Sequence, residues 1–225
     1  MLRSDSTTIT RPAALPNQSP GLMSAPEREE SMPFPGGRLQ RPAKARSRAV
    51  LHFRQVLSRH LLTMSVVAVV TGLGVARVED WKWLLSPLIA HPVHYLAMCV
   101  VIVLGIAIYQ RVKRIPWPAT QIGWVGYLFL ISVVEEWAFR VFLPLYLTDD
   151  LGARASVLLS SVIFGALHYF TLRWRLMACL LTTLGGLGFS RLLDVSGDLA
   201  LVILVHWIVT FLNTPRPPVG ESRQP

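Results

Sequence analysis

Residues 117–147 read WPATQIGWVGYLFLISVVEEWAFRVFLPLYL, an apolar run of 31 residues with only three charged side chains. A helix needs about 20 mostly apolar residues to cross the hydrocarbon of a membrane, and this run is long enough. Its charges, Glu135, Glu136 and Arg140, fall well inside it. Ionisable groups within a span are costly and usually face a bundle interior or a water-filled cavity. The stretch therefore predicts a membrane-spanning helix that carries part of a functional site.

The composition of the whole chain also indicates a membrane protein. Of its 225 residues, 52% are hydrophobic and 16% are charged, and the mean hydropathy is +0.45. Soluble domains carry about 25% charged residues, so an ordinary cytosolic enzyme is excluded. Both cysteines, Cys99 and Cys179, lie inside apolar runs, which excludes a disulfide framework and a cysteine-based metal cluster.

Six apolar runs predict the fold class, an all-α polytopic membrane helix bundle of about six transmembrane helices. The chain is thereby divided into a tail of residues 1–48, a transmembrane bundle of residues 49–214 and a short C-terminal tail of residues 215–225. The predicted spans are residues 60–76, 88–110, 117–147, 155–172, 175–192 and 198–214.

The N-terminal tail is basic and rich in proline, and we expect it to be disordered because it has little apolar surface to bury. Residues 1–60 hold ten Lys and Arg residues against four acidic ones, which suits the anionic lipids of a cytoplasmic leaflet. No aromatic interleaving supports nucleic acid as the partner, so a membrane surface is favoured.

The distribution of positive charge predicts the orientation in the membrane. With the N-terminus inside, the cytoplasmic segments hold 17 Lys and Arg residues and the outer segments hold four. Such an excess marks the cytoplasmic side. We therefore expect a multi-pass integral protein of a bacterial inner (plasma) membrane, with both termini cytoplasmic and with Asp149 and Asp150 on the opposite face.

The two adjacent glutamates differ in the charge partners available to them on their own helix. Glu136 and Arg140 are four residues apart, so they can pair on one helix face. Glu135 lies about 100° around the helix and has no cation at helical spacing. It must therefore meet a partner on another span, meet water, or be protonated.

Two histidines are expected to reach the depth of Glu135. If the polar turn of residues 148–154 joins an antiparallel pair, Glu135 and His168 each lie about 20 Å from that turn. His206 lies mid-way along its own span and can reach a similar level. The remaining histidines receive no role in the site: two lie at a span end and two in or beside the basic juxtamembrane stretch, namely His91, His94, His52 and His60.

These groups suit hydrolysis by an activated water. The sequence has no zinc-binding His-Glu-x-x-His, no Gly-x-Ser-x-Gly elbow and no phosphate loop. Glu135 can act as the general base for water, while His206 and Thr210 donate hydrogen bonds to an oxyanion and Phe164 forms a wall of the site. The predicted reaction is hydrolysis of an acyl or peptide bond, with no covalent enzyme intermediate, no metal and no cofactor.

Three motifs in this order resemble the CAAX-protease and bacteriocin-processing family (CPBP, or Abi). They are Glu135-Glu136-x-x-x-Arg140, Phe164-x-x-x-His168, and His206 followed by a polar residue four positions later. The resemblance covers residues 120–214 and implies a protease core from about residue 117. It implies a glutamic-type intramembrane endopeptidase that cuts a membrane-anchored protein or peptide near its C-terminus. Some similar bacterial proteins are myxosortase-type partners of C-terminal sorting systems.

The same resemblance implies roles for individual residues. Glu135 and His168 would hold and activate the water, with Glu136 and Arg140 supporting Glu135. His206 would lie in the oxyanion site. The family commonly has Asn where this chain has Thr210, which offers one hydroxyl donor in place of an amide.

Two other functions are compatible with buried ionisable groups. Glu135, His168 and His206 could form the relay of a proton-coupled transporter. Transporters often show internal repeats, and no repeat relates residues 60–114 to residues 117–214, which favours the protease. Thr210 leaves open a non-catalytic membrane scaffold or immunity protein that keeps the fold.

Overall fold

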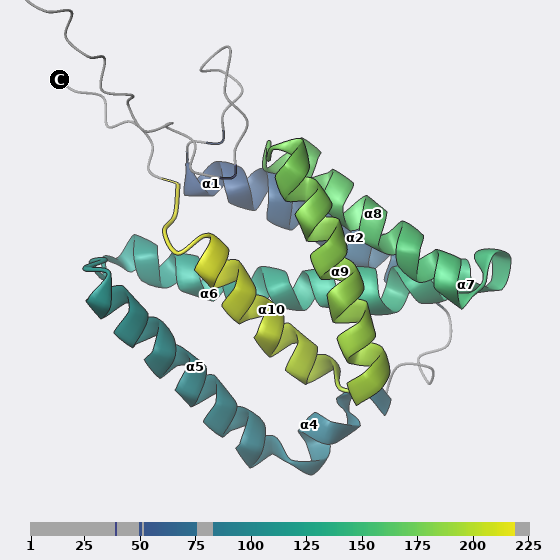
Figure 1. The fold of residues 1–225 in the computed structure, drawn as a ribbon, viewed down its shortest axis with the longest axis horizontal. Coiled ribbons are helices and arrows are strands. Elements are labelled where there is room, and N and C mark those ends of the chain that lie inside the picture. The colour runs from purple at the N-terminus through teal and green to yellow at the C-terminus, as the bar shows by residue number, and fades with distance from the viewer. Residues whose placement is uncertain (1–38, 40–49, 51, 76–82, 219–225) are drawn as a thin grey trace, which may run out of the picture. The chain divides into compact units, whose positions relative to one another are not determined.

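The chain folds into helices joined by short connections (Figure 1). The computed structural model describes residues 39, 50, 52–75 and 83–218. Within these residues no strand occurs, which confirms the predicted all-α class. The predicted tail of residues 1–48 lies outside the described residues except for Leu39, as do residues 219–225 of the C-terminal tail.

The described helices follow one another along the chain, and two of them, η2 and η4, are π-helical. They are α1 (Phe53–Val56), η2 (Leu57–Leu61), α2 (Leu62–Gly74), the 3-10 turn η3 (Trp83–Leu85), α4 (Ser86–Ala90), α5 (Pro92–Val112), α6 (Ala119–Glu136), η4 (Trp137–Phe142), α7 (Leu143–Leu151), α8 (Ala153–Thr171), α9 (Leu176–Ser196) and α10 (Leu199–Asn213).

Two of the helices are long because consecutive segments continue one another without a break. The segments α6, η4 and α7 form one helix, as predicted for residues 117–147. The segments α1, η2 and α2 form another, which begins at Phe53 and not near residue 60 as predicted. Arg54 is exposed there, and a long basic side chain can keep its charge in water while its helix continues. His60 therefore lies inside this first helix rather than beside it.

Tight turns make sequential helices neighbours. Gly152 (φ 75°) separates α7 from α8, within the turn predicted at residues 148–154, and Gly197 (φ 62°) separates α9 from α10. Residues other than glycine rarely adopt these φ angles. Asp198 then caps α10 by accepting a hydrogen bond from the backbone N–H of Leu201 at 3.0 Å.

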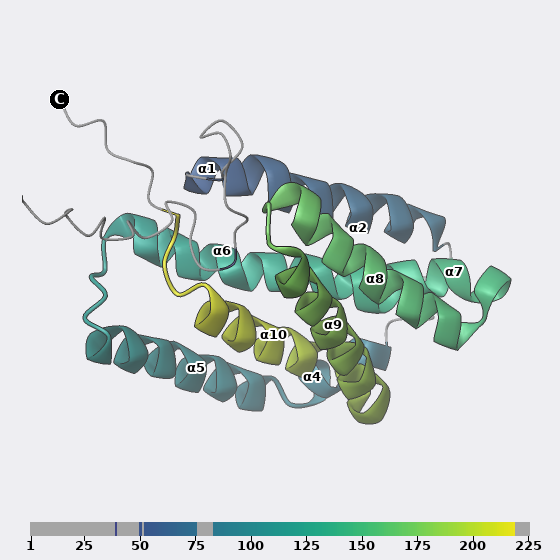
Figure 2. The same ribbon diagram turned by 45° about the horizontal axis from the view of Figure 1, so that its top comes forward.

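The α6–η4–α7 helix runs through the middle of the bundle. In both Figure 1 and Figure 2 α10 lies alongside α6, and α8 packs against α7 and α9. The helix α2 packs against η4 from another side. Aromatic side chains fill the centre, among them the fully buried Phe139, Phe164 and Phe211. The core thus gathers around the helix that carries the charged motif.

A glycine sets the close approach of α8 to α9. A Cβ atom at Gly165 would lie 2.1 Å from Thr183 Oγ1 and 2.7 Å from the carbonyl oxygen of Cys179. Small residues at helix interfaces permit this kind of packing in membrane proteins. The contact fixes α8, which carries His168, against its neighbour.

The described helices fit a membrane. Four are long and apolar enough to span one by length and composition, whereas α10, with 15 residues, is shorter. Leu73, Ile89 and Val93 each expose more than 70% of their surface, as expected of side chains that face lipid. The chain is a polytopic membrane helix bundle. The count of six spans includes α10 and the α6–η4–α7 helix, and it stays a prediction. The four helices that are long and apolar enough are Phe53–Gly74, Pro92–Val112, Ala153–Thr171 and Leu176–Ser196.

Candidate active site

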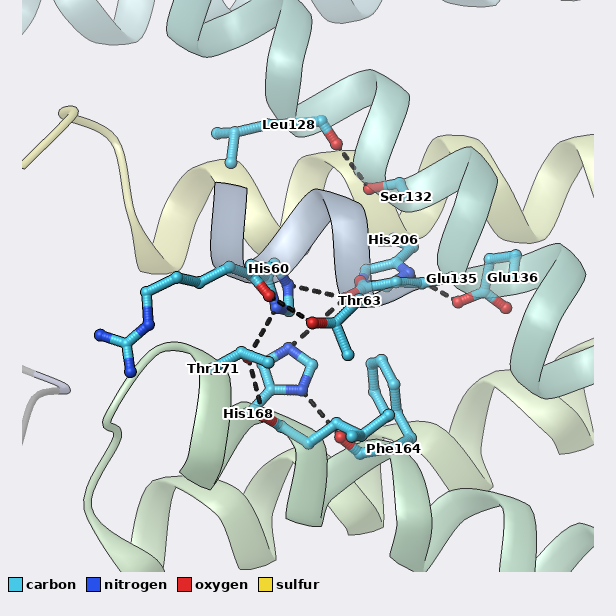
Figure 3. A network of polar contacts seen from close by, with 12 residues as sticks. His60, Thr63, Leu128, Ser132, Glu135, Glu136, Phe164, His168, Thr171 and His206 are labelled. Atoms are coloured by element: carbon cyan, nitrogen blue, oxygen red, sulfur yellow. Dashed lines mark hydrogen bonds and ion pairs between the residues drawn. The ribbon is translucent and has the colours of Figure 1, made fainter. Parts of the chain in front are cut away.

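The three residues predicted to be catalytic meet in the interior of the bundle (Figure 3). Glu135 Oε1, on α6, lies 3.6 Å from Nε2 of His168 on α8. Glu135 Oε2 lies 3.6 Å from Nε2 of His206 on α10. Both separations are longer than a direct hydrogen bond. The common depth expected for Glu135 and His168 is observed.

Glu136 makes one contact that the sequence predicts and one that it does not. Its Oε2 lies 3.4 Å from Nε of Arg140, which is the expected pair at i,i+4. Its Oε1 lies 2.6 Å from Nδ1 of His206. Glu136 thus acts on His206 directly, in addition to the support of Glu135 that the sequence predicts.

His60, which sequence reasoning left without a role, belongs to the same cluster. Its Nε2 lies 2.9 Å from Glu135 Oε1, closer than either of the other two histidines, and its side chain is buried. A signal for it exists in the sequence once the helix is extended to residue 53. Val56, His60 and Met64 then recur at intervals of four and form one buried helix face.

All three imidazoles are held in the same way. Each Nδ1 lies against a protein acceptor, and each Nε2 is directed toward Glu135. The Nδ1 of His168 lies 2.8 Å from the carbonyl oxygen of Phe164. A hydrogen bond at Nδ1 fixes both the ring orientation and which nitrogen carries the proton in the neutral ring. The other two acceptors are Thr171 Oγ1, 2.9 Å from His60, and Glu136 Oε1, 2.6 Å from His206.

Aromatic rings enclose the cluster. The ring centroid of Phe164, the residue predicted to form a wall, lies 4.7 Å from that of His168 and 6.1 Å from that of His206. Phe189 and Trp174 add further rings beside His206 and His168. Such walls exclude water and strengthen the electrostatic interactions inside them.

The Arg140 guanidinium occupies a buried position behind Glu136. It lies over the ring of Phe164, 4.6 Å from the centroid, and a Cβ atom added at Gly186 would lie 3.2 Å from Arg140 Nη2. A buried carboxylate needs a compensating charge, and Arg140 supplies it for Glu136. Among the described residues, this leaves the three imidazoles as the groups that face the charge of Glu135.

Comparison with known proteins assigns the chain to a family. The model of the type II CAAX prenyl endopeptidase Rce1-like family matches residues 93–212, just over half of the chain. The chain belongs to this family. No curated protein and no solved structure matches it.

The family match confirms the resemblance expected from the sequence. The Rce1-like region contains Glu135, His168 and His206 together with the supporting Glu136 and Arg140. The family name implies a membrane protease whose substrates are membrane-associated proteins. The myxosortase-type refinement stays a prediction. His60 lies outside the matched region, so this histidine is an addition to what the Rce1-like match covers.

Thr210 of this Rce1-like chain is part of the predicted site, but its hydroxyl makes no hydrogen bond to the described residues of the cluster. Its side chain is half-buried one turn after His206. Its carbonyl oxygen accepts a hydrogen bond from Thr214 Oγ1 at 2.8 Å. In the described part of the chain, no hydrogen bond joins its hydroxyl to Glu135 or the three imidazoles, and its oxyanion role stays a prediction.

The cluster also has the composition of a metal site. One donor atom each from His60, Glu135 and His168 lie within 4.8 Å of one another. Imidazole and carboxylate are ligands of Zn²⁺, and an acceptor at Nδ1 is a common feature of histidines that bind a metal. These three residues could therefore hold a divalent ion as well as a water molecule.

Proposed function

We propose that this chain is a glutamic-type intramembrane endopeptidase. It hydrolyses a peptide bond near the C-terminus of a membrane-anchored protein with water activated by Glu135 and His168. One observation carries this proposal: three buried imidazoles turn Nε2 toward the single carboxylate of Glu135. A carboxylate that bonds to a water and is oriented by neighbouring imidazoles is suited to general base catalysis.

The proposed water bridges Glu135 and His168 from one side of the line that joins them. Their Oε1 and Nε2 atoms lie 3.6 Å apart, so one oxygen can lie about 2.8 Å from both. Glu135 takes a proton from this water, and the hydroxide oxygen adds to the carbonyl carbon of the substrate. The proton then passes from Glu135 to the leaving nitrogen as the C–N bond breaks, which yields a carboxylic acid and an amine. No bond forms between enzyme and substrate.

His206 supports the oxyanion of the tetrahedral intermediate. When its ring is protonated, Nε2–H donates to the oxyanion while Nδ1–H donates to Glu136, 2.6 Å away. The carboxylate of Glu136 then stabilises the imidazolium, and Arg140 compensates Glu136 in turn. Thr210, one turn further, adds a hydroxyl donor in the place where the CPBP family commonly has an amide.

We propose that this chemistry proceeds without a metal. His60 Nε2 and Glu135 Oε1 lie 2.9 Å apart. Two ligands on one tetrahedral zinc, each at about 2.0–2.1 Å, stand about 3.3 Å from each other. The closer approach favours direct contact between imidazole and carboxylate.

The setting of the enzyme follows from its charge distribution. We propose a bacterial inner (plasma) membrane with both termini in the cytoplasm, since the predicted inner segments carry most of the Lys and Arg residues. Residues 1–48 are a tail that contacts anionic lipids and not nucleic acid. Residues 49–214 are the bundle, with the protease core from about residue 117, and residues 215–225 are a short C-terminal tail.

The test is cleavage by purified protein in lipid vesicles. The substrates are membrane-anchored peptides with varied C-terminal tails, and mass spectrometry locates the cut. Glu135→Gln and His168→Ala should each lower kcat by about 10²-fold or more. His94→Ala, at an exposed histidine outside the cluster, is the matched control and should keep full activity. Full activity in both site variants would refute the proposal and leave these residues as interhelical contacts or a proton path.

A further inference from the structure

The first described helix contributes His60 to the candidate site. The other members of this site lie within residues 93–212, the part of the chain that matches the family model. His60 lies in the π-helical segment η2, and Nε2 is 2.9 Å from Glu135 Oε1. Segments of π-helix are rare and occur often at functional sites. We propose that His60 is a positioning residue that holds the carboxylate of Glu135 for catalysis. This inference rests on the proposed role of Glu135 as general base.

His60 is itself held from behind. Thr171, the last residue of α8, donates its hydroxyl hydrogen to the carbonyl oxygen of Leu167 at 2.7 Å. Its oxygen is then free to accept from Nδ1–H of His60, 2.9 Å away. The ring of His60 also lies edge-on to that of His168, with centroids 4.9 Å apart. The imidazole is thus fixed by α8 before it meets Glu135.

The contact with Glu135 is the closest that this carboxylate makes with the three imidazoles. His168 and His206 each stand 3.6 Å away, beyond hydrogen-bond distance. When the His60 ring carries a hydrogen on both nitrogens, Nδ1–H donates to Thr171 and Nε2–H faces Glu135, but no linear hydrogen bond joins Nε2 to Oε1 in the free protein. Catalytic hydrogen bonds are often poorly aligned in the free enzyme and tighten when substrate is bound.

The orientation of the Glu135 carboxylate matters because its two oxygens face different histidines. Oε1 faces His60 and His168, and Oε2 faces His206. Without His60 the carboxylate can rotate about its terminal torsion, which is broad for glutamate. His60 thereby sets which oxygen meets the water, and a misplacement of about 1 Å can cost about 10²-fold in rate.

Two conservative variants separate this role from a structural one. The amide nitrogen of glutamine can take the place of Nε2, so His60→Gln keeps a donor to Glu135 and loses the contact with Thr171. The amide nitrogen of asparagine takes the place of Nδ1, so His60→Asn keeps the contact with Thr171 and loses the donor to Glu135. Both variants remove the ring, which makes each the control of the other.

The experiment measures kcat and KM of both variants in the vesicle assay, with thermal unfolding in detergent as the check on folding. We expect His60→Asn to lower kcat by about 10²-fold with KM little changed, and His60→Gln to retain at least tenfold more activity than His60→Asn. A kcat of His60→Asn equal to or above that of His60→Gln overturns the inference.

Glu135→Gln in the same assay separates this inference from the proposed function. If Glu135→Gln is inactive while His60→Asn is as active as the parent chain, only the role of His60 fails. If Glu135→Gln keeps full activity, the proposed function fails first.

Discussion

Glu136 and His206 are 70 positions apart in the sequence, yet Glu136 Oε1 and His206 Nδ1 lie 2.6 Å from each other in the interior of the bundle. The same carboxylate forms an ion pair with Arg140. Glu136 therefore connects His206 of α10 to the buried guanidinium of Arg140 in η4. Its charge serves the stability of the bundle as well as the proposed chemistry.

The first prediction compares this buried ion pair with an exposed one. Glu136→Gln leaves Arg140 buried without its counter-charge, and we expect it to lower the free energy of unfolding by about 3–5 kcal/mol. Asp194→Asn removes the partner of Arg191 in a pair whose side chains are 73% and 68% exposed, and should cost at most about 1 kcal/mol. Unfolding in detergent, followed by circular dichroism, measures both. Equal costs would show that Glu136 is not needed to neutralise Arg140.

The second prediction concerns metal dependence. Cleavage should persist after dialysis against EDTA, because the proposed chemistry uses only protein side chains and water. Metal analysis of the purified protein provides the control, since tightly bound zinc can resist a chelator. Loss of cleavage in EDTA with recovery on addition of Zn²⁺ would assign the His60, Glu135 and His168 donors to a metal centre instead.

The third prediction concerns the departure at Thr210. Thr210→Asn restores the amide donor common in the CPBP family, so it should leave kcat unchanged or raise it. Thr210→Val keeps the shape and removes the hydroxyl, so the activation free energy should rise by a few kcal/mol at most, about 3–4 as for one oxyanion donor. Rates of peptide cleavage decide the matter. Unchanged activity in Thr210→Val would exclude the hydroxyl from the oxyanion site.

The fourth prediction uses two glycines of the α8–α9 region. A Cβ at Gly165 meets Thr183 Oγ1 and the backbone of Cys179 at less than 3 Å, so Gly165→Ala should destabilise the bundle. We expect about 1–3 kcal/mol, as for overpacked cores. Gly185 has nothing within 4 Å of such an atom, and Gly185→Ala should be neutral or gain up to about 1 kcal/mol from helix propensity. Melting temperatures in one detergent compare the two variants.

The fifth prediction concerns topology. Asp150 is exposed near the end of α7, and the distribution of Lys and Arg predicts that it lies on the side opposite to the cytoplasmic termini. After replacement of Cys99 and Cys179, Asp150→Cys should react with a membrane-impermeant thiol reagent added from the outer side. Labelling from the cytoplasmic side alone would reverse the proposed orientation.

Much of the fold and of the candidate site could be predicted from the sequence because two physical rules are strict in a membrane. Apolar runs must form helices, which gave the single helix through residues 117–147. Buried charges must meet partners, which placed His168 and His206 near Glu135. Equal distances from a turn were sufficient to match the depths of Glu135 and His168.

Other features depend on contacts that no local pattern determines. The sequence assigns no role to His60 because Arg54 and Arg59 beside it suggest a juxtamembrane segment. The inward face of the first described helix becomes apparent only from the packing of α2 on η4. The contact of Glu136 with His206 likewise depends on how α10 is rotated against α6. Helix rotation is set by tertiary packing, which a hydropathy pattern does not encode.

The burial of the cluster has a kinetic consequence. Glu135 is 2% exposed and His168 and His206 are each 5% exposed, so a peptide backbone touches none of them while the helices are packed as described. Cleavage then requires the helices to part first, a motion of the microsecond-to-millisecond class or slower. The rate of this opening sets a ceiling on turnover, however well the water is activated. For the proposed protease, this opening step would add to selectivity before any bond is attacked, because a scissile segment that enters readily as an extended strand would be cleaved soonest.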